Sequence, residues 1–241
     1  MSIDALVTRM EAIGKDLSPT QRLFHDTYLR TIQAVAAEIH GGGFRDTGWV
    51  EHWDVEFAGL YLDAVTSLRA GKRVPGPWHV AFAAADGPRL PPLRHVLLGM
   101  NAHINYDLPQ ALIAVITDHE FDDPALLDRR RADHEHIDEI LAARVAEEAD
   151  VLKSLELPGD RTLIDRLLEP FNRRGTERFL KEARAKVWRN AHALATARQN
   201  GRLTERLAEL ERLSEARVAH LIRPGRVLLD LARRGFGVEL E

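Results

Sequence analysis

The stretch LRHVLLGMNAHINYDL, residues 93–108, decides how this chain is expected to fold. Its apolar residues recur at steps of three and four, the spacing of one face of an α-helix; they are Leu93, Val96, Leu97, Met100, Ile104 and Leu108. The same spacing continues through almost the whole chain, and no sustained alternation typical of a β-strand interrupts it. The sequence therefore predicts an all-α protein.

Start and stop signals divide the chain into about seven to eight helices. Ser18, followed by Pro19 and Gln21, is typical of a helix start, and three glycines at 41–43 end that helix. An Asn-Gly pair at 200–201 separates the two helices of a long C-terminal hairpin. The expected helices cover about 3–14, 19–40, 46–69, 92–118, 123–155, 161–169, 173–199 and 202–222, with one or two turns at 78–85 and a last turn after Pro224.

Composition limits the class of protein. The 241 residues, 45% of them hydrophobic, suffice for a single helical domain, 1–241. The net charge of -4 argues against nucleic-acid binding. Cysteine is absent, which excludes disulfides and thiolate ligands. No apolar run approaches the roughly 20 residues that span a membrane, and the first residues lack a signal-peptide pattern. We therefore expect a cytoplasmic protein.

Histidines and tryptophans concentrate in residues 18–140, so we expect the functional site there and a helical scaffold in 141–241. On the 92–118 helix, His103 and Asp107 lie one turn apart and can point inward together. They fit either a divalent metal site or an internal hydrogen-bond network. Pro109 lacks the N–H that would bond the Asn105 carbonyl, so a kink that frees the Asn105 and Tyr106 carbonyls is expected here.

Other helices carry similar pairs that would complete a metal shell. His52 and Glu56 stand at the edge of an apolar face, His134 and Asp138 repeat the four-residue spacing, and His25 shares a face with leucine and isoleucine. Carboxylate and imidazole pairs on separate helices are the way helical bundles assemble metal sites. The alternative for each of these histidines is a satisfied residue of the core or of the surface.

Two functions follow from these residues. The first is a metal-dependent hydrolase in which zinc, iron or manganese activates water; with iron, the same ligands would serve a di-iron-type oxygenase. The second is a metal-free binding protein for a small apolar or aromatic molecule. Its expected contacts, beside His103, are Asn101, Asn105, Tyr106, Trp49, Trp53 and His95. The charged C-terminal hairpin could in addition form a homodimer contact or bind another partner.

The string GMNAHINYDLP at 99–109, together with GFRD at 43–46 and FAGLYL at 57–62, resembles an actinobacterial family of unknown function. The resemblance covers most of the chain. It implies no particular activity.

The same helix also resembles the zinc-dependent phospholipase C and single-strand nuclease superfamily, which is all-α. Its motif reads His, three residues, Asp, two residues, Gln-Pro and then a further His. His103, Asp107 and Gln110 stand at the matching positions, whereas Ala111 replaces the proline and Ile113 the later histidine. The superfamily's second ligand pair, His-x3-Glu, is similar to His134 and Asp138. The resemblance implies that His103, Asp107, His134 and Asp138 bind zinc and that zinc-bound water hydrolyses a substrate.

Overall fold

The computed structural model describes residues 1–87, 90–137, 140, 169–223 and 235–241, and for 169–180 only the course of the backbone. Every regular element in these ranges is helical, which confirms the all-α prediction. The elements are α1 (Ile3–Gly14), α2 (Pro19–His40), α3 (Thr47–Arg69), α4 (Gly76–Ala83), α5 (Pro92–Ala102), the π-helix η1 (His103–Asp107), α6 (Leu108–Val115), α7 (Asp118–Asp122), α10 (Glu169–Gln199) and α11 (Leu203–Ile222). Residues 124–137 are helical as well.

The helix boundaries follow local capping chemistry. Ser18 and Gln21 form the predicted capping box at the start of α2. The Asp46 carboxylate accepts the N–H of Trp49 and caps α3. Gly201, with a φ of +70°, makes the turn between α10 and α11. The predicted helix 161–169, the far end of the 123–155 helix and the turn after Pro224 lie outside the described residues, apart from Glu169, where α10 begins.

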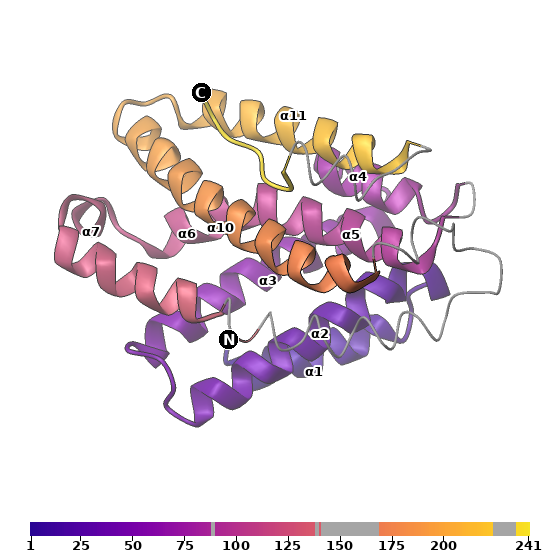
Figure 1. Ribbon diagram of the computed structural model, residues 1–241, viewed down its shortest axis with the longest axis horizontal. Coiled ribbons are helices and arrows are strands. Elements are labelled where there is room, and N and C mark those ends of the chain that lie inside the picture. Colours follow the sequence, from indigo (N-terminus) through magenta and orange to yellow (C-terminus); the bar gives the residue numbers. More distant parts are fainter. Residues whose placement is uncertain (88–89, 138–139, 141–168, 224–234) are drawn as a thin grey trace.

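The rod α5–η1–α6 runs through the middle of the fold (Figure 1). α2 packs against α5 and α3 against α6, while α10 and α11 cover the rod from another side, and α4 packs on α11. The predicted helix 92–118 is therefore present, but it contains a π turn and ends at Val115. Because helices pack on several sides of the rod, four of its polar residues are buried: Asn101, His103, Asn105 and Asp107.

The π turn explains how the chain accommodates a proline inside this rod. Leu108 N–H donates to the carbonyl of His103, five residues earlier, and Pro109 follows with no N–H to give. The side chain of Gln110 donates to the Tyr106 carbonyl at 2.7 Å. At the expected kink the helix forms a widened turn, in which the Tyr106 carbonyl is bonded. Such π turns place side chains at a register that a regular helix does not reach.

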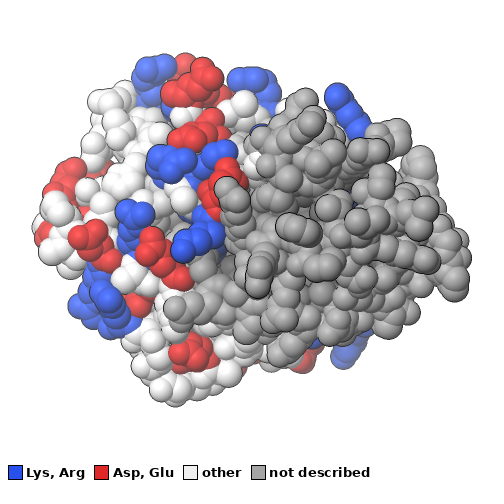
Figure 2. Space-filling view, in the orientation of Figure 1, with Lys and Arg blue, Asp and Glu red and all other residues white. Residues whose placement is uncertain are grey.

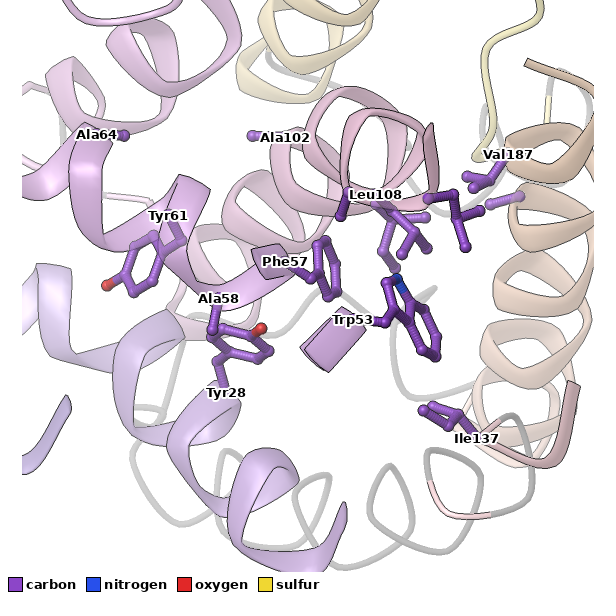
Figure 3. Close-up of a cluster of buried hydrophobic side chains, with 14 of the residues drawn as sticks. Tyr28, Trp53, Phe57, Ala58, Tyr61, Ala64, Ala102, Leu108, Ile137 and Val187 are labelled. Atoms are coloured by element: carbon purple, nitrogen blue, oxygen red, sulfur yellow. The ribbon is translucent and has the colours of Figure 1, made fainter. Parts of the chain in front are cut away.

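The core is rich in aromatic rings. Trp53, Trp78 and Tyr61 are each 1% exposed, and Figure 3 shows Phe57 between Tyr28 and Trp53. On the face seen in Figure 2, basic and acidic side chains of the described residues are interspersed. Among the described helices, none combines the length and the apolar character that crossing a bilayer requires.

Candidate functional site

His103 and Asp107 form a buried pair on η1. Their side chains meet as the four-residue spacing predicts, with His103 Nδ1 at 2.8 Å from Asp107 Oδ2. The two residues are 3% and 1% exposed. Trp78 on α4 donates its indole N–H to the same Oδ2 at 2.8 Å. One carboxylate oxygen therefore holds two rings that come from different helices.

The hydrogen bonds determine which nitrogen of His103 is free. Because an indole N–H can only donate, Asp107 Oδ2 acts as an acceptor, and we assign the imidazole proton to Nδ1. Burial lowers the pKa of His103, although the bond to Asp107 acts in the opposite direction. Burial raises the pKa of Asp107, against the effect of its bonds to His103 and Trp78. The imidazole is neutral, and its Nε2 carries a lone pair without a hydrogen-bond partner in the described structure.

A shell of aromatic rings surrounds His103. Phe57 lies face to face with the imidazole, at 3.7 Å between centroids and 4° between planes. Tyr28 meets it edge-on at 4.5 Å. Three more rings stand 5.9 to 6.1 Å away, namely Phe24, Tyr61 and Trp78. This shell keeps the imidazole in one orientation and in surroundings of low polarity.

Tyr28 Oη and Asp54 Oδ2 are also buried without a partner among the described residues, as is Nε1 of Trp53, which stacks on Phe57. Burial alone raises the pKa of the Asp54 carboxyl to about 7. The Tyr28 pKa is raised well above its usual value by burial, and then by the charges of Asp54 and Asp107. Neither Tyr28 nor Asp54 is among the residues that the sequence pattern predicts for the site. The sequence could have indicated Asp54, because this acidic residue stands between Val50 and Ala58 on one apolar stripe of α3.

The other histidines of the predicted metal shell lie elsewhere. His52 and Glu56 form an ion pair of 3.9 Å whose side chains are 61% and 49% exposed. His25 uses both ring nitrogens, one with Tyr61 Oη and one with the Met10 carbonyl, each at 3.0 Å. Neither is brought together with His103 in one cluster.

His134 occupies a second aromatic environment, between the rings of Trp53 and Trp188 at 5.3 Å from each. Its pKa is lowered well below the usual value, first by burial and then by the charge of Arg184. Asp138 lies outside the described residues. Within the described ranges, no three or more His, Cys, Asp or Glu residues form a group that could hold a metal ion.

The residues predicted to contact a small-molecule ligand also lie apart from one another. Asn101 and Asn105 both donate to the Phe236 carbonyl at 3.0 Å, on the side of the rod away from His103. Trp49 stacks on Trp53 at 5.4 Å. Tyr106 is half-buried, with a pKa raised to about 12, mainly by burial.

A shallow pocket between α2, α4 and α5 lies close to the site. His95, which is half-buried, and Gly99 line it together with the rings of Phe24, Tyr61 and Trp78. The same three rings belong to the shell around His103. The pocket and the imidazole are therefore separated by one layer of aromatic side chains.

Fold and site define an all-α protein with a buried His–Asp pair on a π turn. The model of a family of unknown function, DUF5995, matches residues 3–224, and the chain belongs to this family. No curated protein and no solved structure matches the chain.

Proposed function

We propose that the protein binds a small aromatic or apolar molecule that carries one hydrogen-bond donor, with His103 Nε2 as the acceptor. One observation carries the proposal: Nε2 is buried without a partner among the described residues while Asp107 holds the opposite nitrogen. A buried polar atom left unpaired costs about 1–3 kcal/mol. A ligand donor at Nε2 would offset that cost.

The surroundings of His103 support a ligand of this kind. The shell rings offer aromatic and apolar contacts, and Tyr28 Oη supplies a second polar atom in need of a partner. The neutral imidazole, oriented by Asp107, is also the arrangement of a general base. Entry from the pocket requires Phe24, Tyr61 or Trp78 to turn aside, because these rings separate it from His103.

Binding of phenol and of toluene, which lacks a donor, tests this proposal by calorimetry. We expect the wild type to favour phenol by about tenfold, the value of roughly one hydrogen bond. His103→Phe keeps an aromatic ring against Phe57 and removes the acceptor, so the preference should disappear. His52→Ala is the matched control, because His52 belongs to an exposed pair of the same spacing. Equal affinities for both probes in the wild type would contradict the proposal.

Metal-dependent hydrolysis is the second candidate, favoured by the same free nitrogen. Metal-bound histidines usually donate their other N–H to a carboxylate, a backbone carbonyl or water, and His103 has such a bond to Asp107. In this arrangement Asp107 would orient the imidazole of His103. Zinc, iron or manganese bound at Nε2 would supply the activation of water. We expect about one metal equivalent in protein purified without chelator or affinity tag, and its loss in His103→Phe. Less than about a tenth of an equivalent after reconstitution would rule this candidate out.

Two further proposals concern the setting of the protein. The charged hairpin α10–α11 supports self-association, and the cysteine-free composition supports a cytoplasmic location. Sedimentation over a wide concentration range tests the first, and fractionation of the source cells tests the second.

A further inference from the structure

The segment 235–241 lies extended along the helices, in yellow in Figure 1. Its side chains alternate: Phe236, Val238 and Leu240 are 2%, 6% and 8% exposed, whereas Glu239 and Glu241 are exposed. This period of two is that of a β-strand. The backbone of the segment, however, forms hydrogen bonds with side chains of the helices.

Two asparagines bind the backbone of this segment in the same way. Asn105 donates to the Phe236 carbonyl and accepts from Val238 N–H, both at 3.0 Å. Asn190 on α10 donates to the Val238 carbonyl at 3.0 Å and accepts from Leu240 N–H at 2.9 Å. Each amide thus satisfies a carbonyl and an N–H two residues apart, as a neighbouring strand would.

The remaining contacts define what the groove accepts. The Glu182 carboxylate accepts the N–H groups of Phe236 and Gly237 at 3.1 and 3.2 Å. A Cβ at Gly237 would come within 2.9 Å of the α10 backbone at Ala183, so this position needs glycine.

Basic side chains complement the acidic residues of the segment. Arg189 bonds the Glu239 carboxylate, with one contact at 3.1 Å, and Arg206 bonds the main-chain oxygen of Glu241. Lys186 reaches the Gly237 carbonyl at 3.4 Å. Lys186 also pairs with Glu182 and Arg206 with Glu209, so Arg189 is the basic side chain that bonds a glutamate side chain of the segment.

From these contacts we infer that α5–η1 and α10 form a docking groove for an extended acidic segment of a partner protein. The occupant has three apolar residues at alternate positions. Glycine follows the first apolar residue, and an acidic residue follows the second and the third. Main-chain bonds give affinity in this mode of recognition, and alternate side-chain pockets give specificity. The chain's own segment 235–241 has this pattern and fills the groove until such a partner displaces it.

Fluorescence anisotropy with the labelled peptide Gly-Phe-Gly-Val-Glu-Leu-Glu tests the groove on the full chain. The double variant Val238→Asp/Leu240→Asp releases the chain's own segment, because two carboxylates would otherwise be buried. We expect it to bind the peptide at least tenfold more tightly than the wild type, in which the tethered segment competes at a high effective concentration. Adding Asn190→Ala should weaken binding again by at least tenfold, and a peptide with lysines for both glutamates should bind at least tenfold more weakly.

Three results would overturn the inference: equal peptide binding by wild type and double variant, no effect of Asn190→Ala, or no binding by a double variant that keeps its helical circular dichroism. Wild-type dimers that Val238→Asp abolishes would assign the groove to a second copy and overturn it as well. If the double variant unfolds, hydrogen exchange of the wild type decides. Val238 and Leu240 amides should exchange faster than that of Leu194 on α10 through local opening; equal protection would overturn the inference.

Discussion

At the scale of single residues, the buried polar atoms without a hydrogen-bond partner in the described part of the chain include His103 Nε2, Tyr28 Oη and Asp54 Oδ2. Aromatic rings surround His103 and Tyr28. Buried polar groups are usually paired, yet His103 Nε2 and Tyr28 Oη lie in neighbouring rings without a partner among the described residues. We connect them to binding because each would gain from a polar atom of a ligand.

Asp54→Asn should stabilise the protein at neutral pH and have little effect in acid. The Asp54 pKa of about 7 lies above its ordinary value of 3.8, so the folded state holds the proton more tightly. The wild type therefore loses stability as the pH rises from about 4 to 7. The asparagine variant lacks this loss and should gain up to about 4 kcal/mol in unfolding free energy at pH 8. Urea unfolding at pH 4 and pH 8 checks this, and an equal gain at both would contradict it.

Tyr28→Phe separates a structural hydroxyl from one that serves a ligand. The ring contacts with Phe57 and His103 remain, and only an unpaired buried oxygen is removed. The unfolding free energy should stay within about 0.5 kcal/mol or rise, while phenol binding weakens. A loss of stability above about 1 kcal/mol would show that the hydroxyl has a partner in the folded chain.

The His103–Asp107 contact could be predicted from sequence because a helix brings residues four apart together. The shell could not, because it depends on how α2, α3 and α4 pack against η1. His52 and Glu56 have the same spacing but form an exposed pair, since helical spacing alone does not say which face is covered. Asp54 was predictable in part, as an acidic residue on an apolar stripe.

Among the elements, the crossing of α2 over α5 depends on Gly99. A Cβ there would lie 2.3 Å from Phe24 Cγ and 2.9 Å from Phe24 Cβ. Phe24 also belongs to the shell around His103, so this crossing positions the site as well as the helices.

Gly99→Ala should destabilise the protein by about 1–3 kcal/mol, because the Phe24 ring and the helix behind it must move. Gly59→Ala on α3 is the matched control, since nothing lies within 4 Å of its added Cβ. The control should gain up to about 1 kcal/mol from the higher helix propensity of alanine. Urea midpoints of both variants check this pair, and a neutral Gly99→Ala would disprove the close crossing.

The starts of α2 and α3 could be predicted because their capping residues, Ser18 and Asp46, act locally. The π turn was predictable only as a disturbance at Pro109. A missing N–H shows that a bond is lost, but the surrounding packing decides whether the helix kinks or widens.

At the scale of the whole molecule, the central rod joins the half expected to hold the site to the C-terminal hairpin. α10 contacts both η1 and α6, and Asn105 joins η1 to the segment 235–241. The sequence did not reveal this segment, because a run of alternation so short is weak and its asparagine partner at 105 lies 131 residues away.

The prediction of a single domain requires one cooperative unfolding transition. Circular dichroism and tryptophan fluorescence should give the same urea midpoint. Trp188 would report the C-terminal half, and Trp49, Trp53 and Trp78 the other half. Two separate transitions would show that 18–140 and 141–241 fold independently.

Nitrogen NMR of histidine-labelled protein at pH 7, with phenol and toluene added in turn, tests the role of His103 Nε2 directly. We predict that His103 shows a protonated Nδ1 and an unprotonated Nε2, and that only phenol moves the Nε2 signal. A protonated Nε2, or an Nε2 signal that saturating phenol leaves unchanged, would contradict the claim that this nitrogen is the acceptor of a ligand.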